Sequence, residues 1–249
     1  INEALAASSL DMAVVADIGA LIGKAAGVKH SLVAMGNPDG ITWWLLVSPT
    51  SKFTQVTELK GKKVATVKAT LPHFYLLEAL KANGMQATDI ELINMTGADA
   101  EAALRAGQID AAVSGGPTGA RLLSQGFKAV DSTEQTPIGR GTMAIIASDA
   151  FIAAHPSFFP RFYKVRDRAA EWANANRSKA IDILAKSAGG IDPKLVEPLY
   201  PPPFTFDQSL TPDVLSRVKE VERFLRDLQI TRNPVDVDAW VNQTVSYKR

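Results

Sequence analysis

Three loops of this chain carry small, hydroxyl or acidic residues at points where a strand is expected to give way to a helix. They are residues 68–73, 114–118 and 15–19. In open α/β sheets, ligands bind beyond the carboxyl ends of the strands, where helices begin. A helix N-terminus offers free N–H groups and a partial positive charge, which suit a sulfonate, nitrate or carboxylate group. The loops therefore predict a site for a small anion.

The first loop supplies Thr70, Leu71 and His73 as candidate ligand contacts. A threonine at this position also fits a cap for its own helix, and the two roles are compatible. His73 would lie in the first helical turn, where a structural role is the alternative to ligand contact.

The second loop supplies Gly115, Gly116 and Pro117. Two glycines before a helix let the backbone approach a ligand closely, although an ordinary glycine-containing helix start has the same pattern. The third loop supplies Asp17 and Ile18. Asp17 fits an N-cap. As a ligand contact, its carboxylate would oppose a bare anion but suit an amine, as in a zwitterionic ligand.

Trp43 and Arg140 are two further candidates outside these loops. Trp43 and Trp44 adjoin in one expected strand, so they face opposite ways. One is expected in the core, and the other is placed to wall a cleft against an apolar ligand tail. Arg140, between two glycines, is a candidate anion contact, and a solvated or structural arginine is the alternative.

Composition excludes several other kinds of site. The sequence has 249 residues, a net charge of +1 and no cysteine. Without cysteine there are no disulfides, thiolate metal sites or cysteine nucleophiles. The near-zero charge argues against a nucleic-acid binder, and no apolar run reaches the roughly 18 residues of a membrane span. No metal cluster, phosphate loop or nucleophile–base pair shows a spacing signature, so we expect no metal and no cofactor.

An internal repeat predicts the order of the elements. Residues 4–27 align without a gap on residues 103–126, at a constant offset of 103 − 4 = 99 residues. Each copy has the pattern of a helix end, a turn, a short buried strand after an aspartate, a loop, and a helix ending at glycine. The offset is too long for a solenoid. We therefore expect two similar α/β lobes with a ligand cleft between them.

The two copies differ in what precedes them. An expected strand, helix and strand, at residues 63–67, 72–83 and 90–94, come before the second copy, and nothing equivalent comes before the first. We therefore expect an upstream strand–helix–strand unit, and any targeting peptide, to be missing from this sequence.

The remaining patterns predict how the chain divides. Strands are expected at 31–35 and 43–47 around the turn signal at 37–40. Alternating strands and helices predict parallel sheets with crossover helices. Residues 51–136 are expected to form one lobe, and 1–50 with 137–249 the other, connected by strands 43–47 and 142–147. After Ala147 the pattern is helical, with apolar stripes that include Phe158, Phe162 and Val165, and later Leu215 to Leu228.

Four segments in order resemble a known family. They are LKGKKVATVKATLPHFYLLEALKANGM (59–85), EAALRAGQIDAAVSGGP (101–117), the helical stretch 153–184, and VDVDAWVNQ (235–243). They are similar to substrate-binding proteins of ABC importers, in the group for aliphatic sulfonates, taurine and nitrate. The resemblance implies a type II periplasmic-binding-protein fold: two α/β lobes, two connecting strands and a closing cleft. Family members often carry a small hydroxyl residue where Thr70 stands, which implies contact with an anionic head group.

The resemblance also implies a function and partners. It implies a non-enzymatic, monomeric receptor in the periplasm, or one anchored outside the cytoplasm, that delivers a small organic anion to an ABC permease. Two alternatives share the fold. Sulfinate desulfinases and thiamine-pyrimidine synthases resemble it but rely on cysteine. A ligand-sensing domain of a transcription regulator would need a helix-turn-helix segment upstream.

Overall fold

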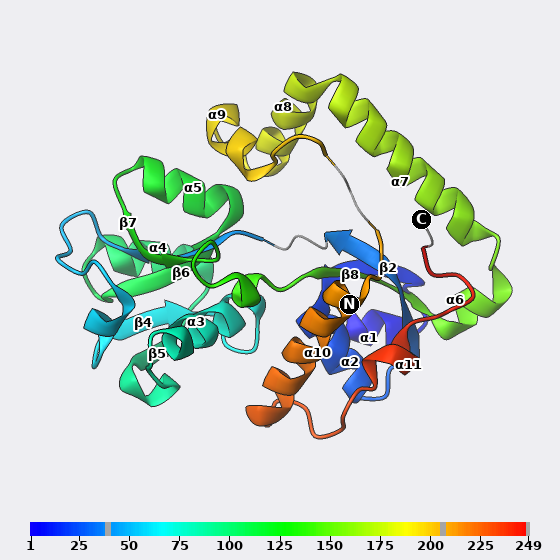
Figure 1. The fold of residues 1–249 in the computed structure, drawn as a ribbon, viewed down its shortest axis with the longest axis horizontal. Helices are drawn as coiled ribbons and strands as arrows, with labels where there is room; N and C mark the ends of the chain where they lie inside the picture. The colour runs from blue at the N-terminus through cyan, green and yellow to red at the C-terminus, as the bar shows by residue number, and fades with distance from the viewer. Residues whose placement is uncertain (38–40, 205–207, 248–249) are drawn as a thin grey trace. The chain divides into compact units, whose positions relative to one another are not determined.

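The chain packs into two compact units, each built from separate stretches of the sequence. The computed structural model describes residues 1–37, 41–204 and 208–247 (Figure 1), so the turn expected at 38–40 lies outside them. The first unit comprises Ile1–Gly40, Gly141–Ala175 and Pro202–Arg249, and the second comprises Ile41–Arg140 and Asn176–Pro201. The assignment of residues to two ligand-binding lobes stays a prediction.

The sheet of the first unit has three strands in the order β1 (Met12–Ala16), β8 (Met143–Ser148) and β2 (His30–Asn37). Both β1 and β2 pair antiparallel with β8. The expected parallel sheet is therefore wrong here, because β8 enters from a distant part of the chain and runs against both neighbours. Local periodicity carries no information about such a partner.

The sheet of the second unit is mixed. Its order is β5 (Glu91–Asn94), β4 (Lys63–Thr66), β6 (Ala111–Gly115), β3 (Trp43–Val47) and β7 (Lys128–Ser132). The prediction of parallel strands is confirmed for β4 with β5 and β6. It is wrong for β3, which lies antiparallel between β6 and β7. The strand that we expected to connect the lobes is thus internal to this sheet.

Helices cover both faces of that second sheet, as its alternating side chains require. Leu45 and Val47 of β3 pack with α3 (Leu71–Ala82) on one face. Leu46, between them, packs with α4 (Gly97–Arg105) and α5 (Gly116–Ser124) on the other face. The first turns of all three helices are thereby held at one edge of the sheet, at the carboxyl ends of β4, β5 and β6.

The predicted repeat is confirmed element by element. Strand β1 and α2 (Asp17–Ala25) coincide with β6 and α5 when 99 residues are added to each number. Two residues past each helix lies a glycine in the left-handed region, with φ of +88° at Gly27 and +89° at Gly126. Such a conformation favours glycine because it has no Cβ. The two sheets also share a pattern of strand pairing. Strand β8 lies antiparallel between β1 and β2, and β3 lies antiparallel between β6 and β7.

The chain after β8 is largely helical, as predicted. Its α-helices are α6 (Asp149–Ala154), α7 (Phe158–Ala175), α8 (Arg177–Ser187), α9 (Pro193–Val196), α10 (Pro212–Asp227) and α11 (Val237–Trp240). Short 3-10 turns lie at Val56–Leu59, Ala87–Asp89, Pro137–Arg140 and Glu197–Leu199, and a short helix, α1 (Asn2–Ala6), opens the chain. Thr211 caps α10 through its hydroxyl, which accepts a hydrogen bond from the Val214 N–H at 3.3 Å.

The predicted apolar stripe of α7 is confirmed at Phe158 and Phe162, which pack against the core, and is wrong at Val165. Phe159 and Tyr163 are buried, whereas Val165 is exposed. The Tyr163 hydroxyl lies 2.9 Å from the Val33 carbonyl oxygen and 2.8 Å from that of Val245. This polar anchor sets the rotation of the helix, which apolar periodicity alone cannot do. In α10 the stripe holds at Val218, Val221 and Leu225, but Leu228 is exposed.

Candidate functional site

A pocket of about 210 Å³ opens in the second unit where the strands end and the helices begin. Its walls come from the ends of β3, β4 and β6 and from the first turns of α3, α4 and α5. The lining residues are Trp43, Thr66, Val67, Pro72, Met95, Gly97, Ala100, Val113, Ser114, Gly115 and Thr118. This is the position in an α/β sheet at which ligands bind.

The three helix N-termini give this pocket a positive potential. No side chain caps the first turn of α3 or α5, while Thr96 caps α4. Unsatisfied N–H groups and the aligned peptide dipoles favour an anion at such ends, by about 0.3–1 kcal/mol per helix where exposed. No charged side chain is among the lining residues. The attraction for an anion therefore comes from backbone dipoles and hydroxyl groups.

Thr66 is the residue that sequence reasoning missed. It is only 3% exposed and lines the pocket, and its hydroxyl has no hydrogen-bond partner among the described residues. A buried polar group left unsatisfied costs about 1–3 kcal/mol. The hydroxyl is thus available to a bound group. A threonine at the carboxyl end of a buried strand, just before a candidate loop, was the sequence signal for it.

Trp43 forms one wall of the pocket, and Gly115 leaves room for its ring. A Cβ atom added at Gly115 would overlap the six-membered part of the Trp43 indole. The indole N–H of Trp43 donates to the Arg140 carbonyl oxygen at 3.3 Å, which fixes the ring from its other end. Trp44 packs over Gly119 instead, in the cluster on the opposite face. The prediction that the two tryptophans face opposite ways is confirmed.

The other predicted residues of the second unit lie next to this pocket but not in its lining. The Thr70 hydroxyl donates to the Val67 carbonyl oxygen and does not cap α3. His73 is buried, and its Nδ1 accepts from the Ala69 N–H at 3.2 Å. Burial, and then the Lys68 charge, lower the pKa of His73, which favours the neutral form of its imidazole.

The remaining residues of these loops shape the first turns of two helices. The Gly116 N–H donates to the Thr42 carbonyl oxygen at 2.9 Å, so it is already used within the protein. Pro117 has no N–H to offer, and Leu71 is buried. Of the second loop, Gly115 is the predicted residue that reaches the pocket.

In the first unit, Asp17 and Ile18 form a buried structural junction. Asp17 is fully buried and is the first residue of α2 rather than its cap. One carboxylate oxygen accepts from the Ile18 N–H at 2.6 Å. The other accepts from the Thr142 N–H at 3.0 Å and from the Thr142 hydroxyl. Burial raises the pKa of Asp17 to about 6, although these hydrogen bonds oppose the rise.

The raised pKa of Asp17 predicts stability that falls with rising pH. Between the ordinary value of 3.8 and about 6, the folded chain holds more protons on this carboxyl than the unfolded chain does. The contribution of the Asp17 carboxyl to the free energy of unfolding is therefore fully present below about pH 4 and is lost as the pH rises past about 6. It amounts to on the order of 3 kcal/mol. Urea unfolding at pH 4 and pH 7 should show the wild type losing more stability than Asp17→Asn over this range. The exposed Asp11→Asn is the control, with a pH dependence like that of the wild type.

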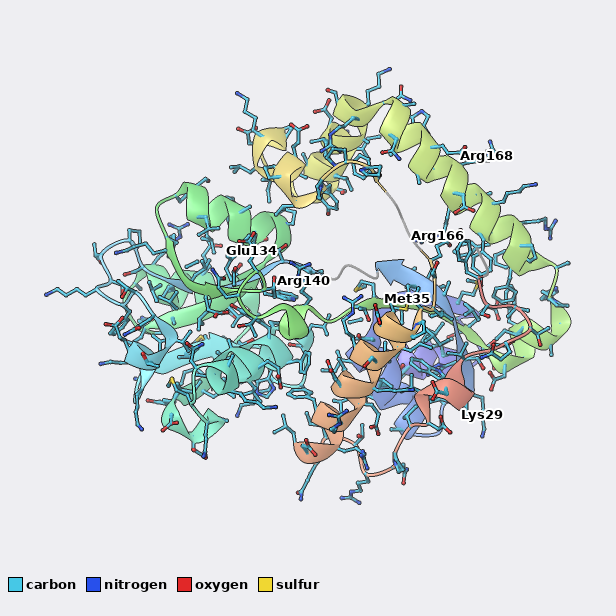
Figure 2. All side chains as sticks on the ribbon, in the orientation of Figure 1. Lys29, Met35, Glu134, Arg140, Arg166 and Arg168 are labelled. Carbon is cyan, nitrogen blue, oxygen red and sulfur yellow. The ribbon has the colours of Figure 1, made fainter. Side chains whose placement is uncertain are left out.

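Arg140 and Arg166 each have a buried guanidinium nitrogen. In α7, Arg166 donates from Nη2 to the Gly36 carbonyl oxygen at 3.2 Å, and burial lowers its pKa. Figure 2 shows Arg168 on the other side of the same helix. The Nε atoms of Arg166 and Arg140 have no hydrogen-bond partner among the described residues. Each of these two Nε–H groups can thus still donate to an acceptor.

Residues 1–37, 41–204 and 208–247 offer neither a metal site nor a membrane-spanning helix. Within these ranges no cluster of three histidine, cysteine or acidic side chains is arranged to hold a metal ion. Within them, too, no helix combines the length and apolar character needed to cross a membrane.

Known proteins share this sequence pattern and this fold. The sequence model of the NMT1/THI5-like family matches residues 1–180. The chain is 27% identical over 237 residues to a protein of Escherichia coli (strain K12) named as a candidate aliphatic sulfonates-binding protein. That alignment covers 94% of this chain and 73% of that protein.

Solved structures extend the likeness to nearly the whole chain. One is named SsuA, the periplasmic sulfonate-binding protein of a candidate sulfonate ABC transporter from Methylobacillus flagellatus KT. It has a TM-score of 0.84 at 20% identity, and the match covers 97% of this chain and 75% of that one. A mutant of DSZB in complex with biphenyl-2-sulfinic acid has a TM-score of 0.80 at 16% identity, covering 96% and 85%. At such low identity, the likeness shows the fold alone. The TM-scores confirm the predicted α/β fold of the periplasmic-binding-protein type.

Proposed function

The chain belongs to the NMT1/THI5-like family, and we propose that it is a solute-binding receptor that delivers a small organic anion to an ABC permease. The carrying observation is the pocket of the second unit, where three helix N-termini meet an unpartnered buried hydroxyl and an apolar wall. The sulfonate-binding relatives named above favour a sulfonate as the anion. They also favour a periplasmic location and a permease partner.

The pocket chemistry suits an anion that carries an organic tail. Hydroxyl groups of Thr66, Ser114 and Thr118 are available to donate to the anion's oxygens. Hydrogen bonds to an ionised acceptor are about twice as strong as neutral ones. Trp43 and Met95 add an apolar surface to the lining, which a bare inorganic anion would leave uncovered. An alkyl or aryl sulfonate satisfies both parts of the pocket.

A binding role accounts for these residues better than an enzymatic one. DSZB shows that the fold also carries enzymes, and the desulfinases that resemble it rely on cysteine, which this sequence lacks. Among the lining residues there is no titratable group to act as a base for Ser114 or the threonines. The pocket holds donors for an anion without a nucleophile to attack it.

The proposal is tested by calorimetry on the purified chain with ethanesulfonate, taurine, nitrate, sulfate and benzoate. We expect the organic sulfonates to bind more tightly than inorganic sulfate or nitrate. An enzymatic role would instead appear as release of sulfite or sulfate from these compounds on long incubation. Absence of binding by all five compounds contradicts the proposed ligand class.

We expect Thr66→Val to have opposite effects on binding and on stability. The substitution keeps the shape of the side chain and removes the unpartnered hydroxyl. Loss of one hydrogen bond to a charged group should weaken sulfonate affinity about 10- to 150-fold. The ligand-free protein should be as stable as the wild type or more so, because a buried unsatisfied group is gone. Thr57→Val, at an exposed threonine of the same unit, is the matched control in calorimetry and thermal unfolding.

A further inference from the structure

The exposed side of α7 carries cations and large apolar side chains together. Arg161, Lys164 and Arg168 are exposed, Val165 is 60% exposed and Trp172 is 46% exposed. Residues three or four positions apart are neighbours on a helix surface. These five side chains therefore form one continuous surface, which we call the α7 stripe.

The α7 stripe lies on the side of the helix that faces away from the core. Phe159, Tyr163 and Ala170 are buried in the first unit. With 3.6 residues per turn, their positions lie roughly 180° around the helix from the stripe. Figure 2 shows Arg166 and Arg168 on opposite sides of α7. The core thus holds α7 by one side and leaves the α7 stripe exposed.

The positive charge of the α7 stripe is not balanced within the described part of the chain. The ion pairs found there include none of its three cations. Of the acidic residues nearby in α7, Asp167 accepts a hydrogen bond from the Gln208 side chain at 3.1 Å. Glu171 is exposed at the margin of the stripe and can offset one charge at most. At least two positive charges, 3 − 1 = 2, therefore remain without a counter-charge.

Helix α10 of the same unit shows what an ordinary solvated helix surface is like in this protein. Its exposed Lys219 pairs with Asp238 at 2.7 Å, and its exposed Arg226 pairs with Glu222 at 3.0 Å. Within Pro212–Asp227 no large apolar side chain is exposed. The α7 stripe differs in both respects, because its cations are unpaired and it exposes a valine and a tryptophan among them.

This combination of side chains suits the surface of an anionic membrane. Lysine and arginine near a membrane are attracted to anionic lipids, and their long alkyl stems let the charged groups reach the phosphates. A tryptophan ring is favoured at the level of the headgroups, where one part of it is apolar and the other is wet. A lipid surface also adapts to a convex helix, whereas a protein partner must match its shape.

We propose that the α7 stripe is a docking surface for anionic phospholipids at a membrane surface. Arg161, Lys164 and Arg168 contact the lipid phosphates, and Val165 and Trp172 lie among the headgroups. The attraction is weak and reversible, because it rests on three cations and little apolar area. It does not depend on which ligand the pocket of the second unit takes.

Vesicle sedimentation tests the proposal with the full chain. The probes are vesicles of phosphatidylglycerol mixed with phosphatidylcholine, and vesicles of phosphatidylcholine alone. We expect the chain to bind the mixed vesicles at low salt and not the neutral ones. Binding should weaken at least about tenfold when the ionic strength rises from about 0.01 M to about 0.15 M, because salt screens exposed charges. Tryptophan emission should shift to shorter wavelength on binding, and Trp172→Phe should lose this shift.

Two triple variants separate the α7 stripe from the net charge of the chain. The first combines the substitutions of the stripe cations, Arg161→Gln, Lys164→Gln and Arg168→Gln. The control removes the same charge at exposed cations elsewhere in the same unit, by Lys29→Gln, Arg223→Gln and Arg232→Gln. We expect the first variant to bind mixed vesicles at least about tenfold more weakly than the wild type, and the control to stay within about threefold. Both should keep the wild-type melting temperature, because the substituted side chains are exposed.

Three results overturn the proposal. The first is equal binding to mixed and neutral vesicles, or to neither. The second is an equal loss in the two triple variants, because net charge alone would then explain binding. The third is binding to immobilised polyglutamate without binding to vesicles, because the partner of the α7 stripe would then be an acidic polypeptide.

Discussion

We expect Gly115→Val to abolish ligand binding while the protein stays folded. A side chain at this position overlaps the Trp43 ring, so the ring must leave its place between Gly115 and the Arg140 carbonyl group. The valine methyl groups would also intrude on a pocket of only about 210 Å³. Overpacking of this kind costs about 1–3 kcal/mol, less than the 5–15 kcal/mol that typically stabilise a folded protein. Calorimetry with the tightest-binding sulfonate should detect no heat of binding.

Gly97→Val is the matched control for this variant. Gly97 lines the same pocket at the start of α4, but a Cβ atom there meets nothing within 4 Å. We expect the sulfonate affinity of Gly97→Val to stay within about fivefold of the wild-type affinity, a difference of roughly 1 kcal/mol in binding free energy. Tryptophan fluorescence should change in the ligand-free Gly115→Val protein and not in Gly97→Val. Sulfonate affinity in Gly115→Val equal to that of the wild type would place the ligand site elsewhere.

The sequence could predict features that depend on short stretches of chain. The 99-residue repeat predicted both strand–helix pairs, since each requires only a buried strand, a loop and a helix stopped by glycine. The helix that ends near Gly84 does so because that glycine takes a φ of +70°. Thr211 with Pro212 marked the start of α10 for a similarly local reason.

Strand partners could not be predicted in the same way. Strand β3 lies between β6 and β7, and β8 lies between β1 and β2, across separations of many tens of residues. Nothing in the uniformly apolar sequence of Trp43–Val47 distinguishes a parallel from an antiparallel neighbour. The parallel expectation was confirmed for β4 with β5, which α3 connects, and for β4 with β6.

The direction of individual side chains also lay beyond the sequence. Both Thr66 and Thr70 lie near the first predicted loop, and the resemblance favoured Thr70. In the structure the Thr70 hydroxyl turns to the Val67 carbonyl group, and the Thr66 hydroxyl is the one left without a partner in the described chain. Asp17 is held by Thr142, 125 residues away, a contact that no spacing rule contains. Its role as a ligand contact stays a prediction, which the next variant addresses.

We expect Asp17→Ala to destabilise the protein by roughly 2–5 kcal/mol. The change removes the acceptor for three donors, the N–H groups of Ile18 and Thr142 and the Thr142 hydroxyl. Each buried donor left unpaired costs about 1–3 kcal/mol, and relief of the buried carboxylate offsets part of that sum. For a chain of this size the melting temperature should fall by roughly 5–15 °C. Thr142→Val, which removes only the hydroxyl, should lose less, and the double variant should not be additive.

Binding measurements on the same variant distinguish a structural Asp17 from a ligand contact. Taurine and ethanesulfonate share a sulfonate group, but taurine also carries an ammonium group that a carboxylate would recognise. If both carboxylate oxygens serve only Ile18 and Thr142, as their hydrogen bonds indicate, Asp17→Ala should leave the ratio of the two affinities unchanged well below its melting temperature. A selective loss of taurine affinity, by about tenfold or more, would instead show that Asp17 contacts the ammonium group. The junction with Thr142 would then open in the ligand-bound protein.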